Sequence, residues 1–145
     1  MPPDARLGTW TFEWYWKQAA GTPGLDAFVA AVRNRTGKVP TAHTWFGYAA
    51  IQAYALACEA AKTTDSKAVA RALANMPLPL DVRMQPKSAF IRGADHQLLS
   101  SAFIGDLLQK GDGDPENLVK VTSIVAGDTI APPVAETGCV MRLPA

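Results

Sequence analysis

The longest run of hydrophobic positions in this chain lies at residues 44–62 and predicts a helix. At about 100° per residue, its polar side chains fall into one narrow stripe, formed by Thr44, Gln52, Glu59 and Lys62. A helix with so narrow a polar stripe has to be covered on most of its circumference. We therefore expect the central packed helix of the domain, with Ile51 and Leu56 in the core. It is too short and too polar inside for a convincing membrane span.

Two further helices are predicted on either side of this segment. Residues 25–36 carry apolar side chains at the i, i+3, i+4 and i+7 positions of an amphipathic helix: Leu25, Phe28, Val29 and Val32. Gly37 follows where a C′ glycine belongs. Residues 67–75 form the other helix, for which Asp65 or Ser66 is the expected N-cap.

The second half of the chain predicts a β-hairpin. Residues 88–92 and 98–107 have the composition of strands, and a turn through Asp95 and His96 joins them. We expect Phe90 and Phe103 to lie on these two paired antiparallel strands.

Other segments are predicted from shorter patterns. Residues 118–125 alternate between the two faces of a strand, and residues 6–11 are β-permissive. Residues 110–117 should be a polar loop, and the tail from residue 131 to 139 an irregular surface segment.

Residues 10–16 are mostly aromatic: Trp10, Phe12, Trp14, Tyr15 and Trp16. Aromatic side chains at this density build a corner of the core or line a ligand cleft, and the pattern leaves both interpretations open.

Composition narrows the class of protein. The chain has 145 residues, 48% of them hydrophobic and 19% charged, which is typical of a globular domain with a sizeable core. The net charge of +1 and the lack of a basic cluster argue against nucleic acid or an acidic membrane as partner.

Cys58 and Cys139 could form a disulfide or remain two separate thiols. No apolar stretch follows residues 1–4, so no secretory signal is expected in this chain.

The inventory of catalytic side chains is small. His43 and His96 are the only histidines, and neither lies in a zinc or nucleophile motif. Asp112, Asp114 and Glu116 have the first spacings of a calcium loop, but the glycine and final glutamate of that loop are missing, which favours a solvated loop. We expect no enzyme, cofactor or metal. An α/β enzyme with dispersed catalytic residues stays the alternative.

Several motifs together resemble a known family. Residues 45–50 read WFGYAA, residues 64–69 TDSKAV, residues 90–99 FIRGADHQLL and residues 132–139 PPVAETGC. Their order and spacing resemble branched-chain amino-acid-type solute-binding proteins, the extracytoplasmic receptors of ABC importers. Residues 35–40, RTGKVP, also fit that pattern between two helices.

The resemblance implies an α/β fold, a partial type I periplasmic-binding-protein fold that covers the C-terminal third and contains segments of both lobes. Residues 1–16 would be an inter-lobe crossing strand with the aromatic segment. Residues 17–95 would belong to lobe 1, with three helices and the first hairpin strand. Residues 96–145 would supply the return strand, a lobe 2 segment and the tail.

The resemblance also implies a function. The intact receptor would capture a small amino-acid-like, amide or aromatic-acid solute between its lobes and deliver it to an ABC permease. Its location would be periplasmic or extracytoplasmic, and its missing N-terminal portion would supply most of the ligand contacts. A ligand-sensing domain of a receptor or regulator with the same fold is the second alternative.

Four ligand-binding residues are expected on this template. In the family, an aromatic residue two positions before the motif tryptophan, here Trp45, packs on the substrate; this chain has His43 there. Imidazole can hydrogen-bond, which favours a polar or aromatic solute, although His43 could equally be an exposed residue at a helix start. Trp14 and Tyr15 lie at the crossing, where they could line the cleft.

Overall fold

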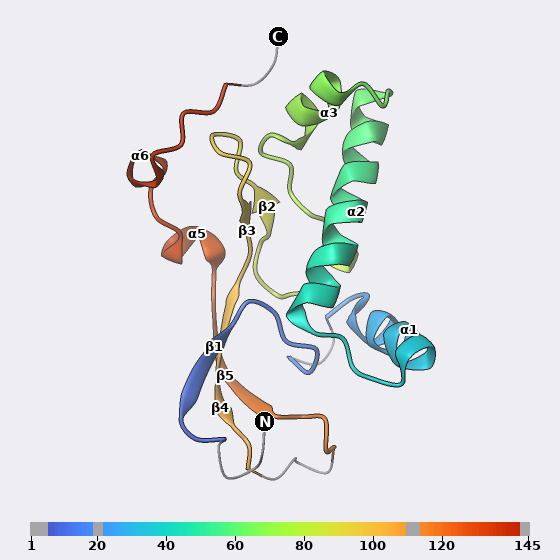
Figure 1. The fold of residues 1–145 in the computed structure, drawn as a ribbon, viewed down its shortest axis with the longest axis vertical. Helices are drawn as coiled ribbons and strands as arrows, with labels where there is room; N and C mark the ends of the chain where they lie inside the picture. The colour runs from blue at the N-terminus through green and yellow to red at the C-terminus, as the bar shows by residue number, and fades with distance from the viewer. Residues whose placement is uncertain (1–5, 19–21, 110–113, 143–145) are drawn as a thin grey trace.

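The computed structural model describes residues 6–18, 22–109 and 114–142, and within them the fold is α/β (Figure 1). The elements in chain order are β1 (Thr9–Phe12), α1 (Leu25–Thr36), α2 (Ala42–Ala61), α3 (Ser66–Leu73), α4 (Leu80–Arg83), β2 (Phe90–Ile91), β3 (Leu98–Leu99), β4 (Ala102–Leu107), β5 (Val119–Val125), α5 (Gly127–Ile130) and α6 (Val134–Thr137). In the view of Figure 1, α1, α2 and α3 lie on one side of the strands, and the single turns α5 and α6 on the other.

The largest sheet of the described residues has three antiparallel strands in the order β1-β4-β5. Phe103 in the middle strand pairs with Phe12 on one side and with Ile124 on the other. The register of β4 and β5 shifts between Ile104 and Gly105. A Cβ at Gly105 would lie 2.4 Å from a methyl group of Val119, so this bulge has room only for glycine.

The predicted hairpin is confirmed at its turn and wrong at its far end. Phe90 pairs with Leu99, and His96 in the turn has a left-handed φ of 52°. However, β3 ends at Leu99, and Phe103 belongs to the other sheet. The backbone N–H of Ser101 donates to the Gln85 side chain at 2.7 Å, so the ladder cannot continue through it.

The three predicted helices are confirmed, with small shifts at their ends. The helix α1 has the predicted bounds, and Gly37 closes it with φ 72° and an N–H donated to the Arg33 carbonyl. The helix α2 is continuous from Ala42, where Thr41 forms a capping box with Thr44. Asp65 caps α3 by accepting from the N–H of Ala68.

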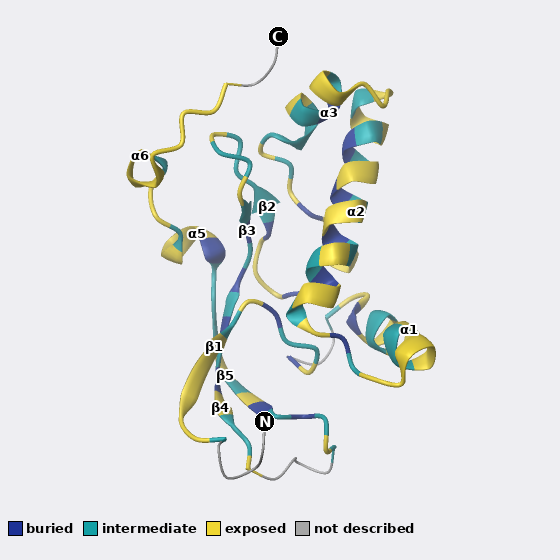
Figure 2. Ribbon diagram, in the orientation of Figure 1, coloured by how far each residue is buried: buried dark blue, intermediate teal, exposed yellow. Residues whose placement is uncertain are grey.

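The covering of α2 differs from the prediction. Its buried residues form a single stripe at i, i+4 spacing: Trp45, Ala49, Ala53 and Ala57. Ile51 is 70% exposed and Tyr54 51% exposed, and Leu56 is only half-buried against the core. The expectation that α2 is covered on most of its circumference, with Ile51 in the core, is therefore wrong. Figure 2 shows the reason, since the rest of the described chain lies against one side of this helix.

The core gathers around two tryptophans. The rings of Trp14 and Trp45 stack with centroids 6.0 Å apart and planes 2° from parallel. Leu78, Met84 and Phe103 are buried in the same cluster. The aromatic segment thus supplies the core through Trp14, whereas Trp10 is largely exposed.

Three smaller expectations can also be compared with the structure. The strand predicted at residues 118–125 is β5, and β1 begins within the β-permissive stretch and extends past it. Of the predicted polar loop, residues 110–113 lie outside the described residues, and the remainder forms a turn. Cys58 and Cys139 are free thiols. No helix within the described ranges is long and apolar enough to cross a membrane.

Candidate functional site

The structure separates the four residues expected to bind ligand. Trp14 and Trp45 are together in the core, with 2% and 0% of their surface exposed. Tyr15, the residue after Trp14, is half-buried, and His43 is exposed in the first turn of α2. Contact of any of the four with a solute stays a prediction.

The two core tryptophans are held by one connecting segment. The indole N–H of Trp14 donates to the Met84 carbonyl at 3.3 Å, and that of Trp45 to the Val82 carbonyl at 3.2 Å. Buried indole N–H groups require such partners. The pair thereby connects the aromatic segment and α2 to α4 and to Met84, which follows α4.

Tyr15 is the centre of a polar network at the start of β5. Its hydroxyl lies 2.8 Å from Oδ1 of Asn117, to which it donates. The same oxygen accepts from the backbone N–H groups of Leu118 at 2.9 Å and Val119 at 3.2 Å. One donor and two lone pairs are all that a phenol offers, so these contacts use its full capacity.

A hollow of about 720 Å³ lies beside this network. Its polar lining comes from separate parts of the chain: Lys17, Gln18, Lys87, Asn117, Lys120, Thr122 and Ser123. Val119, Val121 and Ile124 form part of its apolar wall. Three lysines and no carboxylate line it among the described residues, and its size is that of a small-molecule site.

Sequence reasoning did not find this hollow. Lys17, Lys87 and Lys120 belong to no motif, and only the fold brings them to one place. The alternation of β5 was the one available signal, because it predicts that Val119 and Val121 share a face.

Outside the hollow, two arginines form ion pairs with carboxylates. Arg33 of α1 lies 3.2 Å from Oδ2 of Asp114 and 2.9 Å from Oε2 of Glu116. The pKa of the Asp114 carboxyl is lowered, first by the Glu116 N–H that donates to it and then by Arg33, against an opposing effect of burial. Arg92 binds Asp95 inside the hairpin turn and lowers the pKa of that carboxyl, with a further backbone hydrogen bond from Gln97.

Acidic residues that have the spacing of a calcium loop form ion pairs instead. Asp114 and Glu116 point to a guanidinium group, and Asp112 lies outside the described residues. No group of three or more His, Cys, Asp or Glu side chains in the described part of the chain could hold a metal ion.

Residues 2–112 match the model of a family described as periplasmic binding protein. An amino acid ABC transporter substrate-binding protein from Pseudomonas fluorescens Pf-5 superposes on 96% of this chain with a TM-score of 0.79 and 20% identity. An ABC-type branched-chain amino acid transporter from Rhodopseudomonas palustris CGA009 covers 91% of this chain, with a TM-score of 0.75 and 17% identity.

A third solved structure was determined with a ligand. It is a solute-binding protein of an ABC transporter from Rhodopseudomonas palustris BisB5 in complex with 3,4-dihydroxybenzoic acid, with a TM-score of 0.70, 18% identity and 86% of this chain covered. The chain spans only about a third of the length of these structures, namely 35%, 34% and 32%. No curated protein matches it significantly.

Proposed function

Because this chain belongs to the periplasmic binding protein family, we propose that it supplies part of a receptor that captures a small solute for an ABC importer. The observation that carries this proposal is the superposition of nearly the whole chain on about a third of an amino acid ABC transporter substrate-binding protein. The complete receptor would release its solute to a membrane permease, and it would act in the periplasm or outside the cytoplasmic membrane.

The proposed receptor binds solute between two lobes, of which this chain supplies segments. Residues 1–16 would cross between the lobes, residues 17–95 would belong to lobe 1 and residues 96–145 to lobe 2. Two adjoining lobes can close on a solute by a hinge motion, and the solute shifts an existing equilibrium between open and closed forms.

We further propose a polar amino-acid-like, amide or aromatic-acid solute. His43 is exposed at the start of α2, where a partner for a hydrogen-bonding solute is available. Tyr15 would line the cleft at the crossing with its ring, because its hydroxyl is already hydrogen-bonded to Asn117 and to the start of β5. Trp14 and Trp45 are buried against each other, so in this proposal they act chiefly by fixing the backbone on which His43 and Tyr15 stand.

The test is calorimetric titration of the complete receptor with a panel of amino acids, amides and aromatic acids. One panel member should bind with a stoichiometry of one and be recovered chemically unchanged. The variant H43A should weaken that binding by about five- to tenfold, the worth of one hydrogen bond. The matched control is R35A, an exposed change on α1 that should leave affinity unaltered.

Two outcomes would contradict the proposal. Conversion of a panel compound into product would favour the enzyme alternative, and a folded receptor that binds no panel member would remove the proposed solute class. Equal affinity of H43A and the unsubstituted receptor would remove His43 from the site while leaving the receptor function in place.

A further inference from the structure

A compact set of contacts joins α1 to the turn before β5. Arg33 donates from Nη2 to Asp114 at 3.2 Å and to Glu116 at 2.9 Å. The other carboxylate oxygen of Glu116 accepts from the backbone N–H of Val39 at 3.2 Å. One carboxylate therefore holds both a side chain of α1 and the backbone that leaves α1.

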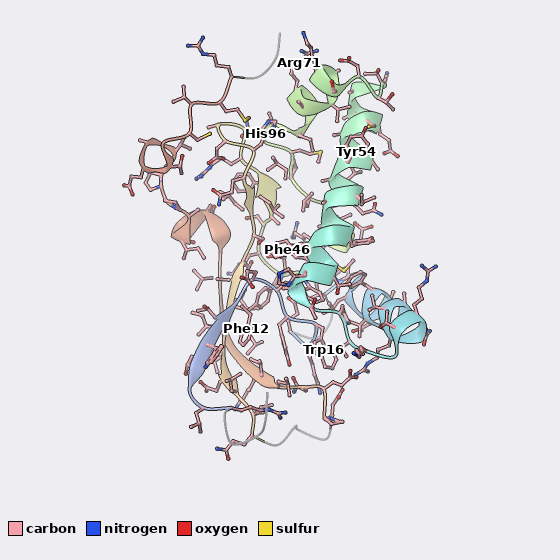
Figure 3. All side chains as sticks on the ribbon, in the orientation of Figure 1. Phe12, Trp16, Phe46, Tyr54, Arg71 and His96 are labelled. Carbon is pink, nitrogen blue, oxygen red and sulfur yellow. The ribbon has the colours of Figure 1, made fainter. Side chains whose placement is uncertain are left out.

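The cation at the centre of this set is also fixed by a ring. The guanidinium carbon of Arg33 lies 4.9 Å from the centroid of the Trp16 ring. The ammonium of Lys17 lies 5.8 Å from the same ring. Figure 3 shows Trp16 between α1 and the strands, and the guanidinium of Arg33 lies over its ring.

A second, uncharged set of contacts lies next to the first. Tyr15 binds Asn117 and the N–H groups of Leu118 and Val119, directly after Glu116 in the chain. The junction thus has an ionic half around Arg33 and a neutral half around Tyr15. Salt screens the ionic half and leaves the neutral half largely unaffected.

We propose that Arg33 is an electrostatic latch that fastens the lobe 1 segment to the lobe 2 segment beside the crossing. The proposal rests on the proposed function, in which residues 17–95 and 96–145 belong to different lobes. A hinge motion of those lobes has to carry the 114–117 turn with α1 or break the contacts of Arg33. The latch therefore favours the arrangement in which the start of β5 stays docked on α1.

The experiment measures amide hydrogen exchange of the 145-residue chain at Val39, Leu118 and Val119, at low and at high salt. The variant R33A should speed exchange at these amides by about two- to fivefold at low salt, the range expected for partly exposed ion pairs. In 1 M salt the Debye length falls to about 3 Å, so unsubstituted chain and R33A should converge.

Three further variants separate a latch from a general loss of structure. R35A changes another basic residue in the last turn of α1 and should leave exchange unaltered. Y15F should speed exchange at Leu118 and Val119 equally at both salt concentrations, because it removes neutral hydrogen bonds. E116Q should reproduce part of the R33A effect and lose most of its salt dependence.

The latch proposal would be overturned if amide exchange in R33A matched that in R35A. It would also be overturned if amide exchange in R33A still responded to salt. Uniformly faster exchange along α2 and β4 would show loss of the fold instead, and in that case E116Q decides between the two. Since the readout is local protection within this chain, failure of the latch leaves the solute-binding proposal untouched. A receptor that binds no solute would likewise leave the exchange result standing.

Discussion

At the scale of single residues, the carboxylate of Asp95 is held by several hydrogen bonds. It accepts from Nε of Arg92 at 3.0 and 3.1 Å and from the backbone N–H of Gln97 at 3.1 Å. Arg92 also donates to the Pro132 carbonyl at 2.9 Å, so this pair connects the hairpin turn to the tail. Only 6% of the Asp95 side chain is exposed.

This pairing predicts an acid-sensitive contribution to stability. The pKa of Asp95 is lower in the folded chain than in the unfolded chain, chiefly through Arg92. A carboxylate shifted in this direction stabilises the fold above its unfolded pKa, and the stabilisation disappears as the pH falls through the folded pKa. D95N should therefore be less stable than the unsubstituted chain at pH 7, and the difference should shrink below about pH 4.

Urea unfolding at several pH values measures this difference in the free energy of unfolding. D128N, which alters an exposed aspartate of α5, is the control and should cost less stability at pH 7 than D95N. A gap between D95N and the unsubstituted chain that persists at acid pH would show that the carboxylate charge is not what stabilises the turn.

Local chemistry explains why some of these features could be predicted from the sequence. Gly37 and Asp65 fulfil capping roles that depend only on neighbouring residues. The break before Phe103 could not be predicted, because it depends on the side chain of Gln85 far along the chain. The hollow beside β5 was missed for the same reason, since Lys17, Lys87 and Lys120 meet only in the folded chain.

At the scale of elements, α2 shows that a periodic sequence pattern can predict a helix without predicting how much of the helix surface is buried. Its polar positions correctly predicted a continuous helix, but the number of apolar positions did not predict how many would be covered. Coverage depends on what the rest of the molecule places against the helix. Here the Trp45 and alanine stripe is buried and Leu56 is partly covered, whereas Ile51 and Tyr54 face outward.

This arrangement predicts a contrast between two leucine-sized residues. I51A should change the free energy of unfolding by about 0.5 kcal/mol or less, because the side chain is already in solvent. L78A should cost about 2–5 kcal/mol, because Leu78 is 1% exposed in the core cluster. Denaturant unfolding of both variants provides the comparison. A cost for I51A close to that of L78A would mean that α2 is covered in solution, for example by a second copy.

At the scale of the whole molecule, the main feature is the share of its structural relatives' length that this chain spans. The fold matches solved binding proteins over nearly all of this chain, yet over only about a third of theirs. A small solute needs most of its surface enclosed and its charged groups matched by placed partners. In the proposed receptor those partners come from both lobes.

We therefore expect that this chain alone does not bind an amino-acid-like solute at micromolar concentration. Loss of even two charge-assisted hydrogen bonds, at about 1.5–3 kcal/mol each, weakens binding by on the order of a hundredfold or more. Titration calorimetry of the isolated chain against the panel of amino acids, amides and aromatic acids measures this. Tight one-to-one binding by a clean monomer would place the complete site within these 145 residues.

The stacked pair of Trp14 and Trp45 gives the protein an optical reporter of its own. Of the four tryptophans, Trp14 and Trp45 are shielded from water, Trp16 is half-buried and Trp10 is 47% exposed, so their emission wavelengths should differ. Unfolding should move the emission of the shielded pair furthest to the red. Because that pair connects the aromatic segment, α2 and the chain around Met84, the spectral shift reports on the integrity of one particular junction rather than on helix content.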